Sequence, residues 1–348
     1  MKRHAEKSPL VSVCVPAYNG GLYLRECLDG ILGQTFDDFE LLLVDDCSHD
    51  STRDIFDEYA HADTRIRIIL NKHNLGLVSN WNQCINLARG EWIKFAFQDD
   101  LLRKDCLEKM LSGATRPLVF CRREFLFEPG TARESVEWYK NLPDIPRVLG
   151  NANDFSPEDV RAAVFQEPLN FFGEPTAALL HKSLFDQFGF FNANLTQLCD
   201  LEYWIRVSTN TGLNYIDQPL AAFRYHTSST SSRNRDPERE ERLSVFDRLV
   251  LAHEHAYSQH YAALREYAAR QTPSQHYPRK LAKKAAWVRA RAHSFAANSD
   301  SPDTTWLDQW NALVTKYPHL GRSPWMIPHW VNQFWQRHVG WRFQRQPR

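Results

Sequence analysis

The sequence has no excess of either charge and no closely spaced pair of cysteines. Lysine plus arginine number 42 and aspartate plus glutamate also number 42, so the formal net charge is zero. Without a general basic surface, the composition gives no support to a nucleic-acid-binding protein. The seven cysteines are odd in number and lack a C-x-x-C pair, which argues against a disulfide framework and a structural zinc site. A reducing, cytoplasmic compartment fits this cysteine usage.

The sequence also lacks long apolar runs. Its first residues, MKRHAEKSPLVSVCV, are partly basic but contain no apolar segment of the kind found in signal peptides. No stretch reaches the roughly 18 apolar residues that a membrane-spanning helix needs. We therefore expect a cytoplasmic protein without a classical export signal or a spanning helix.

The N-terminal part of the chain alternates between strand-like and helix-like patterns. β-branched or apolar runs are followed by segments whose apolar residues recur at helical spacing. This alternation predicts a mostly parallel sheet with right-handed crossovers and helices on both faces. The four predicted strands are 10–16, 39–46, 65–70 and 91–97.

The alternation weakens after Leu111. We expect strands near 117–127 and 213–226, a strand with a short helix in 173–191, and a helix over 200–212. Residues 128–168 are polar and contain prolines, so we predict a loop-rich insertion there. The composition changes after a serine-rich, then charged segment. We therefore predict an α/β domain over 1–232 and a helical C-terminal region over 233–348.

Polar residues follow three of the predicted strands. The first strand leads into PAYNGG, the second ends in Asp45 and Asp46, and the fourth leads into Gln98, Asp99 and Asp100. Each acid alone could be a turn residue or a helix cap. Ligands of open parallel sheets, however, bind outside the carboxyl ends of the strands. Three polar ends at one edge therefore favour a ligand site.

The first turn between strand and helix lacks a phosphate-binding glycine pattern. PAYNGG fits neither G-x-G-x-x-G nor G-x-x-x-x-G-K-[ST]. A diphosphate bound at this edge would need another counter-charge, and a divalent cation held by a carboxylate would supply it. We therefore predict a site for Mg²⁺ or Mn²⁺ together with a diphosphate.

Three segments in this order resemble the family 2 glycosyltransferases with the GT-A fold: VSVCVPAYNGGLYLRECLDGILGQTFDDFELLLVDDCSHDST, LARGEWIKFAFQDDLL and CDLEYWIRV. The resemblance covers roughly residues 9–230. It implies a Rossmann-like GT-A sheet, a nucleoside diphosphate-sugar donor and transfer with inversion. The residues to which it gives donor contacts are Pro16, Ala17, Tyr18, Asn19, Asp46, Gln98 and Asp99.

The resemblance also divides the roles within Gln98-Asp99-Asp100. Asp100 would be the metal ligand, and Asp99 would lie nearer the ribose or the sugar. Gln98 stands where an acid is usual, so any contact it makes would be that of a neutral amide. His226 and the hydroxyls after it could close over the diphosphate. The alternative for His226 is an exposed linker without a role.

The resemblance places the catalytic base at Asp200. In QLCDLEYWIRV, Cys199-Asp200 aligns with the family's Glu-Asp motif, and a cysteine cannot replace the carboxylate of its first position. From the residues alone, Asp200 could simply cap the following helix, and Glu202 competes for the role of base. The resemblance favours Asp200.

The last residues combine a tryptophan-rich apolar face with basic side chains. After Asp308 the sequence contains no acid. Such a segment is typical of a helix lying on an anionic membrane surface, so we expect possible peripheral membrane contact through 324–348. The alternative is that this face packs on the protein itself or on another subunit.

The function predicted from the sequence is a metal-dependent, inverting glycosyltransferase that acts on a glycan or lipid-linked glycan, in cell-surface polysaccharide synthesis. Two alternatives remain open at this stage. A nucleotidyltransferase would need a basic, glycine-rich loop after the first strand, which PAYNGG does not offer. A non-catalytic sugar-nucleotide-binding protein would not need Asp100 and Asp200.

Overall fold

The computed structural model describes residues 8–166, 170–234, 237–272, 277–297 and 304–321. The chain divides into two compact units, Met1–Arg235 and Asp236–Arg348. Every helix in the described ranges is too short or too polar to traverse a bilayer. The C-terminal segment 324–348, for which we expect membrane contact, lies outside the described residues.

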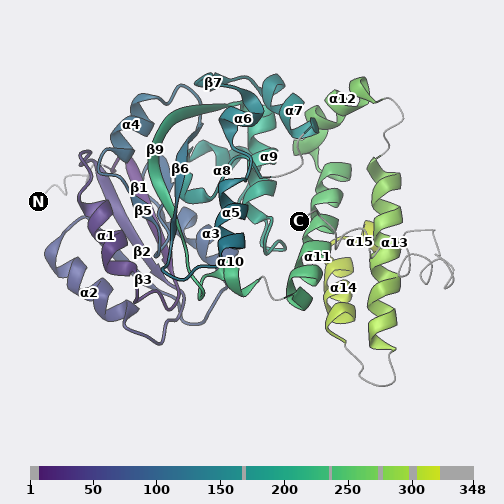
Figure 1. The fold of residues 1–348 in the computed structure, drawn as a ribbon, viewed down its shortest axis with the longest axis horizontal. Helices are drawn as coiled ribbons and strands as arrows, with labels where there is room; N and C mark the ends of the chain where they lie inside the picture. Colours follow the sequence, from purple (N-terminus) through teal and green to yellow (C-terminus); the bar gives the residue numbers. More distant parts are fainter. Residues whose placement is uncertain (1–7, 167–169, 235–236, 273–276, 298–303, 322–348) are drawn as a thin grey trace, which may run out of the picture. The chain divides into compact units, whose positions relative to one another are not determined.

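The first unit is built around one sheet, which Figure 1 shows nearly edge-on. Nine strands of the described chain form it, in the order β3-β2-β1-β4-β8-β6-β9-β5, with β7 paired to β9. The strands are β1 (Val11–Ala17), β2 (Phe39–Asp45), β3 (Ile66–Leu70), β4 (Trp92–Phe95), β5 (Leu101–Leu102), β6 (Leu118–Phe127), β7 (Asp154–Phe155), β8 (Ala178–His181) and β9 (Leu213–Tyr225).

The parallel half of the sheet is the part that the sequence predicts. β1 pairs in parallel with both β2 and β4, and β2 pairs in parallel with β3. β8 then joins β4 and β6 in the antiparallel sense, while β6 and β9 run parallel. The ends of β1, β2 and β4 therefore meet at one edge of the sheet.

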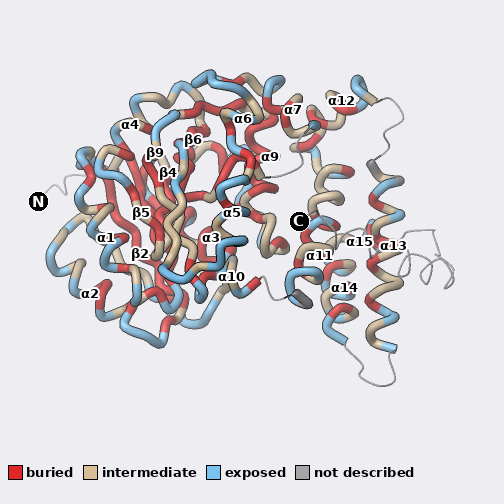
Figure 2. Tube along the Cα trace, viewed as in Figure 1, coloured by how far each residue is buried: buried red, intermediate tan, exposed pale blue. Residues whose placement is uncertain are grey.

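Helices cover both faces of this sheet. Alternate residues of β1 and β2 point to opposite faces, and those of one face form a core with α1, α2 and α4. On the other face α3 contacts β1 and β2, and Figure 2 shows both strands as buried. The helices of this unit are α1 (Leu24–Leu32), α2 (Thr52–Ala62), α3 (Leu77–Leu87), α4 (Cys106–Ser112), α5 (Arg133–Lys140), α6 (Ile145–Leu149), α7 (Pro157–Gln166), η1 (Pro175–Ala177), α8 (Ser183–Phe188), α9 (Cys199–Thr211) and α10 (Thr230–Arg233).

The prediction of a loop-rich insertion over 128–168 is wrong. Three helices, α5, α6 and α7, lie in this stretch. The start of α7 carries a signal that identifies it: Ser156 and Asp159 cap each other's backbone N–H groups, at 2.8 and 3.2 Å. This reciprocal arrangement is a capping box. Prolines at the first turns of α6 and α7 begin these helices rather than interrupt them.

The second unit is helical in its described parts. α13 contacts α11, α14 and α15, and α12 follows the short helix η2. Leu249, Val288 and Ala292 are among its fully buried residues. Its helices are α11 (Pro237–Tyr257), η2 (Gln259–Tyr261), α12 (Ala262–Gln271), α13 (Tyr277–Ala296), α14 (Thr305–Lys316) and α15 (Pro318–Gly321).

Candidate functional site

The loop after β1 is held against the other two strand ends. The Tyr18 N–H donates to Gln98 Oε1 at 2.8 Å, and Gln98 Nε2 donates back to the Tyr18 carbonyl at 3.3 Å. The Asn19 N–H donates to Ser48 Oγ at 2.8 Å, after β2. A Cβ at Gly20 would lie 2.3 Å from Gln98 Oε1, so only glycine allows this close approach. Pro16, Ala17, Tyr18 and Asn19 thus lie at the shared edge that the sequence predicts.

Asp46, after β2, is buried and serves the chain's own backbone. Its Oδ1 accepts from the Leu75 N–H at 2.8 Å and from Asn71, and its Oδ2 accepts from the Gly76 N–H at 2.9 Å. These bonds fix the loop between β3 and α3 beside the shared edge formed by the ends of β1, β2 and β4. A nucleoside contact by Asp46 stays a prediction; the described role of its carboxylate is to position this loop.

Asp100 is buried, with 1% of its surface exposed. Its Oδ2 accepts from Thr176 Oγ1 at 2.5 Å, and its Oδ1 accepts from the Arg224 N–H at 3.0 Å. Burial raises the pKa of Asp100 well above its usual range, and the charge of Asp99 adds to the rise. The carboxylate therefore joins the end of β4 to η1 and β9, and its role as a metal ligand stays a prediction.

Asp99 faces His226. His226 Nε2 lies 2.8 Å from Asp99 Oδ2, and the two side chains are 8% and 21% exposed. His226 Nδ1 lies 2.9 Å from Ser228 Oγ, which fixes the ring. The tyrosine ring of Tyr23 lies 4.9 Å from the imidazole. His226 is therefore part of an ordered cluster with Asp99 rather than an exposed linker.

Asp200 occupies the first turn of α9. Its Oδ1 accepts from the Leu201 N–H at 2.7 Å, and its Oδ2 accepts from Asn170 Nδ2 at 3.0 Å. Desolvation raises the pKa of Asp200 to about 7, and the negative charge of Glu174 also raises it. A carboxylate with this pKa can accept a proton near neutral pH.

Glu202, the competitor for the role of base, is occupied elsewhere. It is 1% exposed and forms a two-bond ion pair with Arg206, at 2.9 Å to both Nε and Nη2. Arg206 also donates to the carbonyls of Phe188 and Phe190. Cys199, the first residue of α9, is buried. Glu202 therefore anchors α9, and the role of Asp200 as the base stays a prediction.

Sequence reasoning missed three residues that shape these carboxylates. Thr176 and the Arg224 backbone hold Asp100, and Asn170 holds Asp200. The Arg224 guanidinium also donates to the Asp99 carbonyl at 2.9 Å and to Glu26 at 2.6 Å. None of them lies in a motif of recognisable spacing, because each contact joins segments far apart in the sequence.

The residues at this edge fit a divalent cation only in part. No group of three or more histidine, cysteine, aspartate or glutamate side chains suited to a metal ion occurs among the described residues. Asp99 and His226 do supply an oxygen and an imidazole nitrogen that face each other. Both are ordinary ligand types for Mn²⁺-like cations, which usually take their other ligands from water and substrate phosphates.

The comparisons with known proteins decide the family. The family model described as "Glycosyl transferase family 2" matches residues 12–189. The chain belongs to glycosyl transferase family 2. The match contains the strand ends at Tyr18, Asp46 and Asp99, and it ends before Asp200 and His226.

Two curated relatives match about two thirds of the chain. The Mycobacterium tuberculosis protein MT1568, whose function is uncharacterized, is 30% identical over 232 residues, 64% of this chain and 69% of its own length. Chondroitin synthase of Pasteurella multocida is 26% identical over 244 residues, which are 70% of this chain but only 23% of that enzyme. The chain thus spans less than a quarter of the synthase.

Solved structures show the same fold. S. aureus TarS 1-349 in complex with UDP-GlcNAc superposes with a TM-score of 0.57 at 16% identity, covering 89% of this chain and 81% of that TarS 1-349 chain. The mannosyltransferase PcManGT of Pyrobaculum calidifontis, in complex with GDP-Man and Mn²⁺, gives 0.51 at 18% identity and covers 96% and 89% of the two chains. The predicted GT-A fold is confirmed.

Proposed function

We propose that the chain is an inverting glycosyltransferase that moves a sugar from a nucleoside diphosphate-sugar to a hydroxyl group of a glycan or lipid-linked glycan. Family membership supports the transferase reaction. The complexes of TarS with UDP-GlcNAc and of PcManGT with GDP-Man support a nucleotide-sugar donor. The relationship to a chondroitin synthase supports polysaccharide synthesis as the setting.

The observation that carries this proposal is the environment of Asp200. The carboxylate is held by Asn170 and by the Leu201 N–H, and its pKa is raised to about 7. A base must be ionised at working pH and must still bind a proton strongly, so a pKa near neutrality suits it. Asp200 lies on a helix that the Glu202–Arg206 pair fixes in the core.

In the proposed reaction Asp200 takes the proton of the acceptor hydroxyl. The acceptor oxygen forms a bond to the anomeric carbon while the bond from that carbon to the diphosphate breaks. The leaving diphosphate keeps the electron pair, so the charge that develops there needs stabilisation. Attack opposite the leaving group inverts the anomeric centre, and no covalent intermediate with the protein is involved.

The donor would lie at the ends of β1, β2 and β4. Tyr18, 38% exposed, borders this edge together with Gln98. Asp99 and His226 are the residues that would hold a divalent cation, because the Asp99 side chain is 21% exposed and faces His226, whereas Asp100 is only 1% exposed. When bound, the cation would neutralise charge on the leaving diphosphate. The Mn²⁺ in the PcManGT complex supports such a cofactor.

Calorimetric titration of UDP, GDP and TDP, with and without Mn²⁺, tests the donor site. We expect one nucleotide to bind in a Mn²⁺-dependent manner to the wild type. Asp99→Asn should weaken that binding at least tenfold, because it removes a charged ligand. Asp100→Asn is the matched control, because it makes the same carboxylate-to-amide change at the neighbouring acid. It should leave the nucleotide affinity within about threefold of wild type.

Two results would contradict the proposal. If no nucleotide binds, or if binding is indifferent to Mn²⁺ and to Asp99, the strand ends do not form a donor site. If Asp100→Asn removes the metal dependence and Asp99→Asn does not, the metal assignment returns to Asp100, as the sequence resemblance implies. All residues used in this proposal lie in the unit Met1–Arg235.

A further inference from the structure

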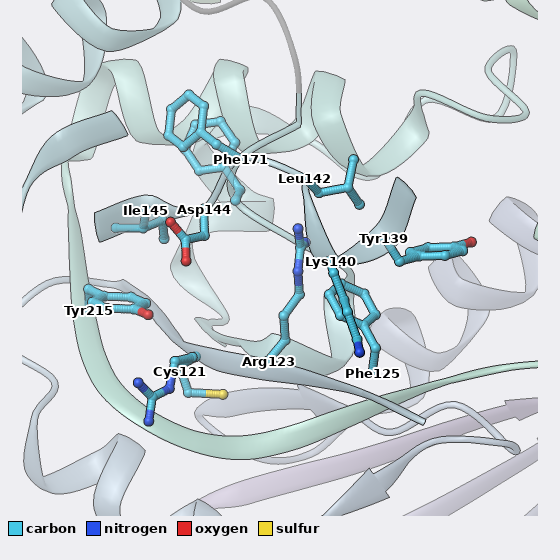
Figure 3. A pocket seen from close by; sticks show the side chains of 12 residues that line it. Cys121, Arg123, Phe125, Tyr139, Lys140, Leu142, Asp144, Ile145, Phe171 and Tyr215 are labelled. Carbon is cyan, nitrogen blue, oxygen red and sulfur yellow. The ribbon is translucent and has the colours of Figure 1, made fainter. Parts of the chain in front are cut away.

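A pocket lies beside the segment Asn170–Glu174. It has a volume of about 90 Å³, room for a few water molecules or one small chemical group. Figure 3 shows its side chains, which come from β6, β9, the region of α5 and α6, and the segment itself. The lining residues are Cys121, Arg122, Arg123, Phe125, Tyr139, Lys140, Leu142, Asp144, Ile145, Phe171, Phe172 and Tyr215.

Cationic side chains outnumber acids among the residues that line this pocket. Arg122, Arg123 and Lys140 line it, and Asp144 is the acid among the lining residues. The Asp144 carboxylate accepts from the Arg147 N–H at 3.0 Å and thereby caps α6. Arg122 has a partner in Asp217 at 3.3 Å, but that pair is half exposed, so solvent weakens it. Arg123 is paired with Glu174, so the pocket offers an anion Lys140 and the remaining donors of the two arginines.

The two arginines reach the pocket through an irregularity in the sheet. Consecutive residues of a regular strand point to opposite faces, yet Arg122 and Arg123 both line this pocket. The pairing of β6 with β9 shifts register between Cys121 and Arg122 and again between Arg122 and Arg123. Such irregularities re-aim side chains and are frequent beside functional sites.

Arg123 is held in place on several sides. Its side chain is 9% exposed, and its Nη1 donates to Glu174 Oε2 at 3.1 Å. Its guanidinium carbon lies 5.2 Å from the centre of the Phe125 ring. Gly173 has a φ of 111°, and a Cβ there would lie 2.7 Å from Arg123 Nη1. Because a guanidinium has five N–H donors, the bond to Glu174 leaves others for a ligand.

The segment Asn170–Glu174 connects this pocket to the base. Phe171 and Phe172 form part of the pocket wall, while Asn170 donates to Asp200. Glu174 binds Arg123 and raises the pKa of Asp200. Aromatic side chains with a few fixed polar groups are the usual lining of a small-ligand pocket. A molecule bound in the pocket thus contacts the same short segment that holds Asp200.

We propose that this pocket binds an anionic group of the acceptor, a carboxylate or a phosphate, and so presents a neighbouring hydroxyl group to Asp200. This inference rests on the proposed function, because only a transferase has an acceptor. Arg123 and Lys140 provide charge-assisted hydrogen bonds to the anion. The acceptor is accordingly an acidic glycan, with a uronate or a phosphodiester next to the sugar that is modified.

The test compares charged and neutral probes by saturation-transfer NMR titration of the full chain. The probes are D-glucuronate for a carboxylate, sn-glycerol 1-phosphate for a phosphate, and D-glucose as the neutral reference. We expect at least one charged probe to bind about tenfold more tightly than glucose. Arg122→Gln with Lys140→Gln should weaken binding of the charged probe about tenfold, because this variant removes two positive charges from the pocket lining. Both side chains are exposed, so their replacement spares the buried contacts of Arg123.

A matched control removes two positive charges elsewhere. Lys104→Gln with Arg133→Gln also changes exposed residues, and neither lines the pocket. The control should bind the probes like the wild type, and both double variants should keep the wild-type nucleotide affinity. The charged probe that binds more tightly identifies carboxylate or phosphate as the group.

Three results would overturn the inference: charged probes that bind no more tightly than glucose, equal losses in the two double variants, or loss of nucleotide binding in the pocket variant. Failure of the proposed function is seen separately, because it appears as absent nucleotide binding in the wild type.

Discussion

His226 Nε2 lies 2.8 Å from Asp99 Oδ2. The contact joins the loop after β9 to the loop after β4, two segments that the sequence separates by 127 residues. It brings together the two side chains that we propose as ligands of a cation at the ends of β1, β2 and β4. It also gives His226 a partner that its position in a serine-rich segment does not reveal.

We expect His226→Gln to weaken Mn²⁺-dependent nucleotide binding about tenfold, because an amide is a poorer ligand than imidazole. Nucleotide binding measured without Mn²⁺ should change little. His181→Gln is the control: His181 is another histidine paired with an acid, Glu91, but it lies beside Trp92, at the start of β4. Equal losses in the two variants, measured by calorimetry, would contradict a specific role for His226.

Asp200→Asn should lower the rate of sugar transfer at least a hundredfold, because a positioned general base contributes about 10²- to 10⁴-fold. Nucleotide affinity should not change. In the wild type the rate should rise with pH through about 7, since the base acts only when ionised and its pKa is raised to about 7. Steady-state kinetics over pH 5–9 checks both. Asp186→Asn, an exposed acid on α8, should behave as wild type.

Glu174→Gln should move the acidic limb of that pH profile to lower pH. The charge of Glu174 raises the pKa of Asp200, so its removal makes Asp200 easier to ionise. It also frees Arg123, whose positive charge acts in the same direction. The same pH–rate measurement applies, and an acidic limb that stays in place or moves upward would refute the electrostatic link.

Asp100 should make stability depend on pH. Its pKa is raised in the folded state, so its contribution is fully present below the unfolded-state value of about 4 and is lost as pH rises through the folded-state pKa. The stability of wild type relative to Asp100→Asn should therefore fall as pH rises. Urea unfolding at pH 4.5 and pH 8 measures this difference. A difference that grows with pH would count against it.

Glu202→Ala should destabilise the first unit by about 3 kcal/mol, because it leaves the Arg206 charge buried without its partner. The protein that remains folded should keep its transfer rate. Glu202→Leu combined with Arg206→Met should recover much of the lost stability, since no charge is then stranded. Unfolding curves and kinetics on the same samples test this, and a stable but inactive Glu202→Ala would return Glu202 to consideration as the base.

The parallel half of the sheet could be predicted from sequence because its strands are short, strongly apolar runs. Val11, Val13 and Val15 of β1 and Leu41 and Leu43 of β2 are fully buried, so the hydrophobic pattern alone specifies them. The helices between 128 and 168 were harder to predict, because they are short and rich in polar residues. The signals that mark α6 and α7 are short: the Ser156–Asp159 capping box and the prolines at their first turns.

The placement of the acids at one edge followed from the strand ends, but the roles of Asp99 and Asp100 did not. The two are neighbours in sequence, and their side chains take different partners: His226 for one, Thr176 and the Arg224 N–H for the other. Those partners are at least 76 residues away. Which of two adjacent carboxylates is buried depends on such distant contacts, and no local pattern encodes them.

The indole N–H of Trp204, on α9, donates to the Gly173 carbonyl at 2.9 Å. Together with the bond between Asn170 and Asp200, it links the segment Asn170–Glu174, which borders the pocket, to the helix that carries the proposed base. A change that widens the pocket by shifting this segment will also displace the partner of Asp200. Variants selected for bulkier acceptors would therefore transfer the sugar more slowly, unless compensating changes arise in α9.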